Sequence, residues 1–406
     1  MTFPGENSVM PTYARYPLAL VRGEHTRVID ADGRSYLDFA GGLGALSLGH
    51  CHPRWLEAVR QEAATIGLVS NLFATAPQAR LAERLAALLP IPDARAFFCN
   101  SGAEANEAAI KLVRKHGLAR ARPKIVALEV SFHGRTVATL AATGQPTKRE
   151  PFEPLVDWFV HVLPGDLKVL EAALVPGDAC AVMLEPVMGE GGVLPLSHEY
   201  LQGVRSLCDE HGALLVADEV QSGSGRCGAW LAISLADVVP DVATLAKGLG
   251  GGLPIGACVS RADIAFGPGE HASTFGGGPV PCAAALAVIQ TIEDDDLLAR
   301  ASEMGGRLQN QIALLAGDAL VDEVRGRGLL IGIQLKRPVA HEVVLAMIDQ
   351  GVLATEAGPD VVRMSPPLIV APEDVDEAAD ALAAALEKVA AALGVGAVTR
   401  TKGTAP

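Results

Sequence analysis

A lysine stands where an apolar segment of the chain meets a run of glycines. In the stretch 242–252, VATLAKGLGGG, Lys247 follows a β-like run and comes just before four glycines in five residues. A lysine amine attacks a carbonyl only when it is deprotonated, and a desolvated pocket lowers the lysine pKa in that direction. We therefore hypothesise that Lys247 forms a Schiff base. This stretch alone leaves a solvated lysine at a strand end as the alternative.

Two adjacent carboxylates follow another apolar segment. Asp218 and Glu219 come after five apolar residues in 213–223, ALLVADEVQSG. Ligands bind at the carboxyl ends of strands in an open parallel sheet, and an aspartate there can keep a pyridine nitrogen protonated. The pair could also bind Mg²⁺, but the sequence has no G-x-x-x-x-G-K-[ST] phosphate loop. No G-x-G-x-x-G directly follows a predicted strand, which disfavours a dinucleotide oxidoreductase.

The stretch 97–107, FFCNSGAEANE, has the features of a capped helix start. Ser101 and Glu104 have the spacing of a capping box, with Gly102 and Ala103 in the first turn. Free backbone N–H groups and the helix dipole make such a start a natural anion site, and small side chains leave room for a phosphate. A capped helix without a ligand is equally compatible with this stretch.

Two further loops carry residues suited to a cofactor or a substrate. In 131–136, SFHGRT, Phe132 could stack on a planar cofactor and Arg135 could clamp a carboxylate. In 184–192, LEPVMGEGG, Glu190 lies between glycines and could face a pocket. Ordinary loop positions in contact with solvent are the alternative for all three residues.

Hydroxyls and a second arginine occur towards the C-terminus. Ser273 and Thr274, in 272–278, ASTFGGG, could donate to phosphate oxygens, or could simply begin a helix. Arg363 stands inside an apolar run, VVRMSPPLIV. A buried arginine needs an anionic partner, and we expect either a substrate carboxylate or Glu190 to supply it.

The composition of the 406 residues is typical of a soluble α/β enzyme, with 50% hydrophobic and 20% charged residues and 43 glycines. A net charge of −14 argues against a broad basic surface for nucleic acid. The seven cysteines form no CxxC pair, so neither a disulfide framework nor a metal site is predicted, and a reducing cytoplasm is expected. No apolar run reaches the ~18 residues that a membrane span needs, and no signal peptide is predicted.

The spacing of apolar residues predicts the elements that must position these groups. A hairpin is expected within 20–40, around Asp32-Gly33. Helices are predicted at 53–66, 77–89, 103–117, 166–174, 197–211 and 279–293, and strands at 95–99, 124–130, 156–162, 179–184, 213–218, 241–246 and 255–259. Apolar strands interleaved with helices predict a mostly parallel sheet covered on both faces.

The amino-acid composition of the predicted elements changes after the helix at 279–293. Long acidic and Ala/Leu-rich helices (295–316, 338–350, 372–394) flank short strands near 328–335 and 361–363. We therefore expect three regions, because single cores stop growing at about 250–300 residues. They are an N-terminal segment, 1–50, that packs with a small domain, a large ligand-binding domain, 51–290, and the small C-terminal domain, 291–406.

Together these segments resemble the class III aminotransferases of pyridoxal phosphate fold type I. The resemblance rests on SNLF at 70–73 and on FFCNSGAEANEAAIKL, SFHGRT, EPVMGEGGV, DEVQSG, TLAKGLGGGLPIGA and STFGGGP, and it spans nearly the whole chain. It implies an α/β fold with a mostly parallel central sheet in a large domain and a smaller α+β domain built from both termini. It also implies pyridoxal 5′-phosphate and a homodimer whose active sites are shared across the interface.

The resemblance also implies a role for each candidate residue. Around the cofactor ring it implies Lys247 as Schiff-base lysine and proton shuttle, Asp218 on the pyridine nitrogen, Phe132 and Val220 on the two faces, and Gln221 near the ring hydroxyl. The phosphate would be held by Gly102 and Ala103, joined by Thr274 of a neighbouring subunit. For the substrates it implies Ser273 of that neighbour, Arg135 on the distal carboxylate, Arg363 on the α-carboxylate of glutamate, and Glu190 masking Arg363 while an ω-amino substrate is bound.

Within the family, the motifs are most similar to enzymes that act on N2-acetyl-L-ornithine with 2-oxoglutarate as amine acceptor. Transamination of aminoadipate semialdehyde in lysine synthesis, of ornithine or of 4-aminobutyrate are alternatives. An aminomutase of the glutamate-semialdehyde type would share Lys247 and Asp218 but would need no 2-oxoglutarate. A cofactor-binding regulator is disfavoured, because no additional DNA-binding segment is present. The sequence departs from the family's motifs at two places. Gly278 stands where the family has an asparagine, and the loop 41–49 lacks an asparagine. Both departures concern the choice of substrate.

Overall fold

The computed structural model describes residue 3 and the residues 5–315 and 320–395. Parts of the predicted regions 1–50 and 291–406 therefore lie outside the described residues. The boundaries predicted near 50 and 290 stay a prediction. Within the described residues, no helix is both long and apolar enough to cross a membrane.

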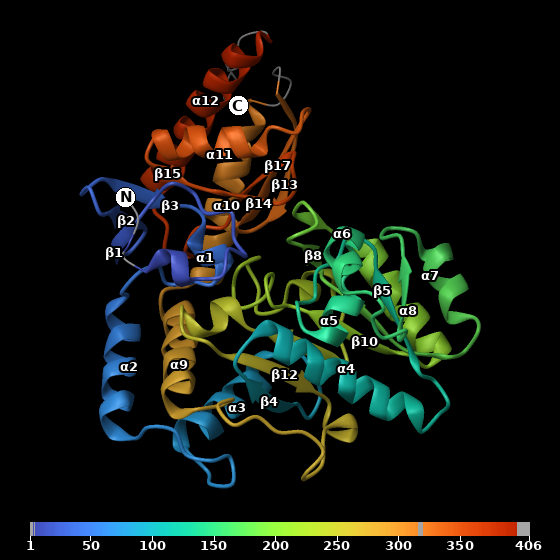
Figure 1. The fold of residues 1–406 in the computed structure, drawn as a ribbon. Helices are drawn as coiled ribbons and strands as arrows, with labels where there is room; N and C mark the ends of the chain where they lie inside the picture. The colour runs from blue at the N-terminus through green and yellow to red at the C-terminus, as the bar shows by residue number, and fades with distance from the viewer. Residues whose placement is uncertain (1–2, 4, 316–319, 396–406) are drawn as a thin grey trace.

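A seven-stranded sheet forms the centre of the larger part of the molecule (Figure 1). Its strand order is β4 (Arg95–Cys99), β12 (Gly256–Ser260), β11 (Val242–Leu245), β10 (Leu214–Asp218), β7 (Ala179–Leu184), β5 (Lys124–Leu128) and β6 (Phe159–Val162). The strands from β11 to β6 pair in parallel, whereas β12 is antiparallel to both of its neighbours. The prediction of a mostly parallel sheet is confirmed.

Successive residues of the inner strands enter different cores, because side chains alternate across a strand. Val126 and Leu215 belong to a core that also contains residues of α3, α7 and α8, while Ile125 and Val216 belong to the core formed with α4. Helices therefore cover both faces, as the near-continuous apolar strands predict. The bounds of these helices are Ala76–Leu88 for α3, Gly102–Leu118 for α4, Leu167–Leu174 for α7 and His198–His211 for α8.

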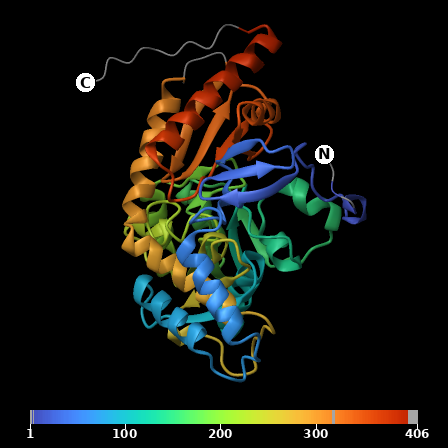
Figure 2. The ribbon, with the colours of Figure 1, turned by 90° about the vertical axis from the view of Figure 1, so that its left-hand side faces the viewer.

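The C-terminal part has its own core, which includes N-terminal residues. Its sheet has the order β13 (Val321–Arg327), β14 (Leu330–Leu335), β17 (Val361–Met364) and β16 (Thr355–Glu356), and its helices are α10 (Leu297–Ala313), α11 (Ala340–Asp349) and α12 (Pro372–Leu393). Tyr36 and Phe39 are buried in the same core as Leu308 and Leu382. Figure 2 shows the N-terminal strands lying against this C-terminal part.

One strand pairing joins the two ends of the chain directly. The N-terminal strands β1 (Leu20–Glu24), β2 (Arg27–Asp30) and β3 (Ser35–Asp38) form a sheet whose edge is completed by β15 (Val352–Leu353). Leu37 pairs in parallel with Val352, and Asp38 with Leu353. The predicted hairpin is confirmed by the antiparallel pairing of β2 with β3 around Asp32 and Gly33. The helices α2 (Pro53–Thr65) and α9 (Pro279–Asp294) lie side by side along one flank of the larger part, below the C-terminal part (Figure 1).

Some short elements depart from the prediction. The single strand expected at 328–335 is the second strand of a hairpin, because the stretch before it also pairs, as β13. Two short helices, α5 (Val137–Ala142) and α6 (Pro146–Arg149), fill a segment for which no element was predicted. Helices of six and four residues are too short to show a helical period. The remaining short α-helix and β-strands of the described residues are α1 (Gly41–Gly44), β8 (Val187–Met188) and β9 (Leu194–Pro195).

Candidate active site

A cavity of about 440 Å³ opens at the carboxyl edge of the central sheet. Nine of the residues selected from the sequence line it, which are Gly102, Ala103, Phe132, Arg135, Glu190, Asp218, Val220, Gln221 and Lys247. They meet there because β4, β7, β10 and β11 all end at this edge. The expected position of a ligand site in an open α/β sheet is the same.

Lys247 lies just beyond β11 and begins a short 3₁₀ turn, Lys247–Gly250. Its φ of 40° lies in the left-handed region, which a residue with a side chain rarely adopts and which often accompanies a functional site. Burial lowers the pKa of its amine to about 8, against the opposing effect of the nearby Glu190 carboxylate. No hydrogen bond joins this amine to another described residue, and its lowered pKa makes the neutral, nucleophilic form accessible near neutral pH at the cavity wall.

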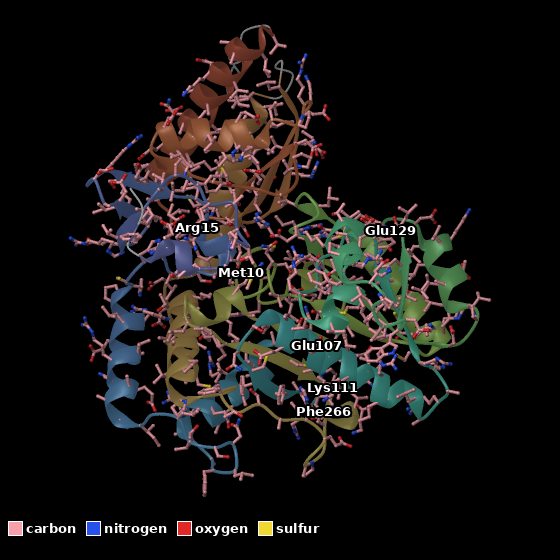
Figure 3. The ribbon with its side chains drawn as sticks, in the orientation of Figure 1. Met10, Arg15, Glu107, Lys111, Glu129 and Phe266 are labelled. Atoms are coloured by element: carbon pink, nitrogen blue, oxygen red, sulfur yellow. The ribbon has the colours of Figure 1, made fainter. Side chains whose placement is uncertain are left out.

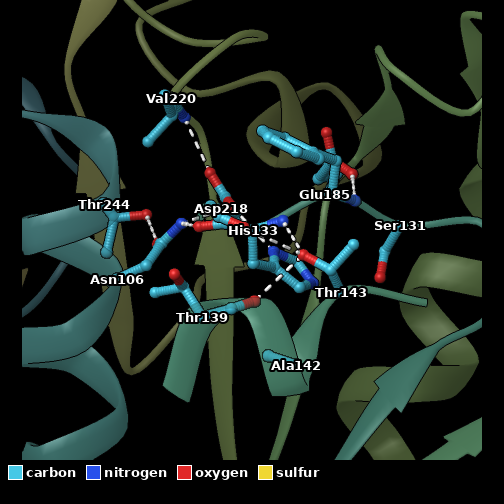
Figure 4. A network of polar contacts seen from close by, with 12 residues as sticks. Asn106, Ser131, His133, Thr139, Ala142, Thr143, Glu185, Asp218, Val220 and Thr244 are labelled. Atoms are coloured by element: carbon cyan, nitrogen blue, oxygen red, sulfur yellow. Dashed lines mark hydrogen bonds and ion pairs between the residues drawn. The ribbon is translucent and has the colours of Figure 1, made fainter. Parts of the chain in front are cut away.

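Asp218 is held by three hydrogen bonds at the end of β10 (Figure 4). Asn106 Nδ2 donates to its Oδ2 at 2.7 Å, and His133 Nδ1 lies 2.7 Å from the same oxygen. The backbone N–H of Val220 donates to Oδ1 at 3.0 Å. A carboxylate can only accept, so His133 carries a proton on Nδ1. The buried carboxylate is thereby fixed in orientation at the floor of the cavity.

The hydrogen bonds continue from Asp218 into a buried network (Figure 4). Asn106 Oδ1 accepts from Thr244 Oγ1 at 2.6 Å, and Asn106 Nδ2 also lies 2.8 Å from the carbonyl oxygen of His133. The backbone N–H of His133 donates to Thr143 Oγ1 at 3.0 Å. The network ties α4, β11 and the loop after β5 to the single carboxylate of Asp218.

Sequence reasoning missed His133 and Asn106 as site residues. Both stand inside motifs that were selected, SFHGRT and GAEANE, but their common partner Asp218 is far away in sequence. The available signal was their position, His133 next to Phe132 and Asn106 three residues after Ala103 on the same helix.

The start of α4 has the features of an anion-binding cradle. Ser101 Oγ accepts from the backbone N–H of Glu104 at 3.2 Å, as the capping box predicts. The return contact differs, because Glu104 accepts from the backbone N–H of Asn100 at 2.9 Å. A Cβ at Gly102 would lie 2.6 Å from Cγ1 of Val220, so a larger residue would fill the cradle. The helix N-terminus therefore presents backbone N–H groups to the cavity without side chains in front of them.

The loop 131–136 is held from two sides. The backbone N–H of Phe132 donates to Glu185 Oε1 at 2.8 Å, and that of Gly189 donates to Oε2 at 3.3 Å. Burial raises the pKa of Glu185 to about 7, with a further increase from the negative charge of Asp218. Glu107, labelled on α4 in Figure 3, accepts from Thr136 Oγ1 at 2.6 Å. Glu185 is thus a cavity-lining carboxyl that positions Phe132.

Arg363 and Glu190 form an ion pair at the side of the cavity. Arg363 lies on β17, is 1% exposed and also donates to the carbonyl oxygen of Gly189 at 3.3 Å. The expectation that Arg363 has Glu190 as an anionic partner is confirmed. Arg363 lowers the pKa of Glu190 by its charge, against the raising effect of burial, which is the largest influence. Arg135, by contrast, is exposed at the cavity wall.

Gln221 leaves an acceptor unsatisfied in the cavity wall. Its Oε1 is buried and has no hydrogen-bond partner within the described part of the chain. A Cβ at Gly189 would lie only 1.2 Å from that oxygen, so a larger residue there would displace the Gln221 amide. Buried polar atoms are normally paired, so an unpaired acceptor facing a cavity indicates a ligand group that donates to it.

Ser273 and Thr274 do not line this cavity. They line a second cavity, of about 920 Å³, together with Asn71 and Leu72. Apolar side chains stand exposed near it, namely Leu72 at 89%, Phe73 at 69% and Phe275 at 64%. Such a group of exposed large apolar residues is typical of a protein–protein contact.

The comparisons with known proteins agree on one family. The class-III aminotransferase profile matches residues 9–386. The acetylornithine aminotransferase of Mycolicibacterium smegmatis is 51% identical over 387 residues, which are 95% of this chain and 97% of that protein. That of Gloeobacter violaceus is 49% identical over 92% of this chain and 94% of that protein.

Solved structures give the same result for the fold. The crystal structure of N-acetylornithine aminotransferase from Stenotrophomonas maltophilia has a TM-score of 0.82 and 37% identity, over 94% of this chain and 98% of that one. The ornithine aminotransferase of Toxoplasma gondii has a TM-score of 0.91 and 30% identity, over 96% and 94%. The predicted fold type I architecture is confirmed.

Proposed function

Because this chain belongs to the class-III aminotransferases, a family that depends on pyridoxal 5′-phosphate, we propose that it transfers the δ-amino group of N2-acetyl-L-ornithine to 2-oxoglutarate. The products would be N-acetyl-L-glutamate 5-semialdehyde and L-glutamate, a step of arginine biosynthesis. The names of the relatives support this substrate over ornithine, 4-aminobutyrate or aminoadipate semialdehyde.

The residues of the cavity fit the cofactor. The unpaired Oε1 of Gln221 suits a ring hydroxyl, and the start of α4 with Gly102 and Ala103 suits a phosphate. Asp218 would hold the proton on the ring nitrogen, and Phe132 and Val220 would contact the ring faces. When bound, pyridoxal 5′-phosphate supplies an aldehyde for the amine and a ring that withdraws electrons from the reacting carbon.

Lys247 would hold the cofactor covalently and would act as the base of the reaction. Its Nζ would take the proton from the substrate carbon that carries the amine. A pKa of about 8 leaves this amine able both to accept and to release a proton near neutral pH. Glu185 would keep Phe132 in place through the backbone hydrogen bond at 2.8 Å.

The pairing state of the two arginines is the observation that carries the proposal. An enzyme that alternates between an ω-amine and glutamate meets one carboxylate at the far end of the first substrate and two carboxylates in the second. Arg135 is exposed for the distal carboxylate, whereas Arg363 is neutralised by Glu190. An amine donor with a single carboxylate therefore meets one available guanidinium, and the α-carboxylate of glutamate would take Arg363 from Glu190.

We propose a homodimer in which Ser273 and Thr274 complete the partner's site. Within one chain both residues lie outside the cavity of Lys247, and they lie in the region of the exposed Leu72, Phe73 and Phe275. Thr274 would bind the cofactor phosphate of the neighbouring subunit, and Ser273 would contact its substrate. A cytoplasmic location is proposed on the seven cysteines, all of which are free.

The test is single-turnover spectroscopy of the cofactor-loaded enzyme. Acetylornithine, ornithine, 4-aminobutyrate and lysine are added separately, and the loss of the visible cofactor band is timed. We expect acetylornithine to react fastest, and 2-oxoglutarate to restore the band. Faster reaction with another amine would overturn the substrate while leaving the cofactor and Lys247 in place. Restoration of the band without added 2-oxoglutarate would favour an aminomutase.

A further inference from the structure

Arg226 is a buried cation on the loop that follows β10. The residue is 2% exposed, and the same loop carries Val220 and Gln221 of the active-site cavity. Within the described part of the chain, no carboxylate forms an ion pair with Arg226, and burial lowers the pKa of its guanidinium to about 10. Burying a charge in this way is costly unless its N–H groups find other acceptors.

The acceptors of Arg226 are backbone carbonyl oxygens from three separate segments. Its Nη1 donates to the carbonyl oxygen of Leu329 at 3.2 Å and to that of Pro366, and its Nη2 donates to that of Gly44 at 3.5 Å. Leu329 lies in the turn between β13 and β14 of the C-terminal part. The main chain takes part as well, because the carbonyl oxygen of Arg226 accepts from the backbone N–H of Leu329 at 2.9 Å. One residue of the larger part thus holds three other parts of the chain.

Two of these segments, 39–47 and 365–368, form one layer. Backbone hydrogen bonds of 2.8 Å join them to each other at both ends. The first segment carries Ala45, which lines the active-site cavity, and the second begins two residues after Arg363. Arg226 therefore links this layer to the loop that carries Val220 and Gln221.

The sequence of the layer explains why it needs a donor from outside. Pro366 and Pro367 have no backbone N–H, so the only hydrogen-bonding groups of this stretch are its carbonyl oxygens. Three of the four residues 41–44 are glycines, which restrain the main chain least. A planar guanidinium presents several N–H donors in a fixed geometry, so the single side chain of Arg226 can fix both segments at once.

We propose that Arg226 is a positioning residue for dicarboxylate binding, because it holds this layer against the larger part and so sets the separation between Arg363 and Arg135. This inference rests on the proposed function, in which glutamate or 2-oxoglutarate bridges the two arginines. A ligand bound at two points gains its second contact at little cost only when that separation is already correct. The cofactor contacts and Arg135 belong to the larger part, so the cofactor and a ligand with one carboxylate do not depend on Arg226.

The test compares R226M, R226K and the parent, each as cofactor-loaded enzyme. R205M removes a largely buried arginine of α8 that pairs with Asp241, and is the matched control for a general loss of stability. Calorimetry measures the dissociation constant of glutarate, an unreactive dicarboxylate, and single-turnover spectroscopy measures acetylornithine. We expect R226M to weaken glutarate by about tenfold, with the acetylornithine rate and the cofactor dissociation constant changed by less than about twofold. R226K should recover glutarate binding only in part, because an ammonium cannot span three carbonyl oxygens, and R205M should bind glutarate as the parent does.

Hydrogen exchange measures the same link without reference to any substrate. In R226M the backbone amides within 39–49 and 364–370 should exchange about fivefold faster or more, while those of β7 and β10 keep the rate of the parent. Unchanged exchange in the layer, or an unchanged glutarate constant in R226M, would overturn the proposal. Equal weakening of glutarate, acetylornithine and cofactor would overturn it in favour of general damage, and full glutarate affinity in R226K would show that a charge alone suffices. A parent that converts another amine faster than acetylornithine would overturn the proposed substrate, and the glutarate and exchange measurements would still decide the role of Arg226.

Discussion

The pH dependence of covalent cofactor capture tests the central property of Lys247. Only the neutral amine attacks an aldehyde. With its pKa lowered to about 8 by burial, about 9% of the amine is neutral at pH 7, against about 0.04% for an ordinary lysine. The reactive fraction is thus about 200-fold larger than in a solvated lysine. We expect the rate of capture to rise tenfold per pH unit below about pH 7 and to level off above about pH 8.

The assay mixes the apo protein with excess pyridoxal 5′-phosphate between pH 6 and pH 10 and follows the visible band by stopped flow. Lys247→Ala should give no such band, and the exposed Lys168→Ala should behave as the parent. Glu190→Gln should move the plateau to lower pH, because the Glu190 carboxylate opposes the lowering of the lysine pKa. A rate that still rises tenfold per unit between pH 8 and pH 10 would refute the reasoning.

Three further changes test other parts of the site. Gly102→Ala places a Cβ 2.6 Å from Cγ1 of Val220. Overpacking of this size should weaken cofactor binding about tenfold in equilibrium dialysis. An unchanged dissociation constant of the cofactor would contradict a phosphate site at the start of α4. His133→Phe removes a donor from the buried Asp218 carboxylate. This change should lower the free energy of unfolding of the apo protein, measured in urea, by about 1.5–3 kcal/mol. A recovery in His133→Asn would support the loss of a donor as the cause, and an unchanged stability of His133→Phe would contradict it. The double change Leu72→Glu and Phe275→Glu places charges on the exposed apolar group. It should shift the sedimentation coefficient from that of a dimer to that of a monomer and abolish activity, whereas Leu393→Glu on α12 should do neither. A dimer that persists in the double variant would contradict the proposed interface.

The sequence predicted best those groups whose signal is local. Lys247 and Asp218 each follow an apolar strand directly, so their place at the sheet edge could be derived from the strand alone. Glu190 was one of the two anionic partners expected for Arg363, because a guanidinium in an apolar run must find an anion, and the structure shows this ion pair.

The network behind Asp218 could not be derived in the same way. Asn106, His133 and Thr244 come from different elements, and their hydrogen bonds depend on how α4 packs on the sheet. The helices α5 and α6 were missed because each is too short to show a period.

The pairing of β3 with β15 has a consequence during synthesis of the chain. Roughly 300 residues separate the two strands, and ribosomes add about 5–20 residues per second, so the N-terminal sheet waits about 15–60 s for its last strand. Until then β3 presents an open edge, of the kind that recruits strands from other chains. A chain released after residue 349 would contain every strand of the central sheet and still leave that edge uncovered.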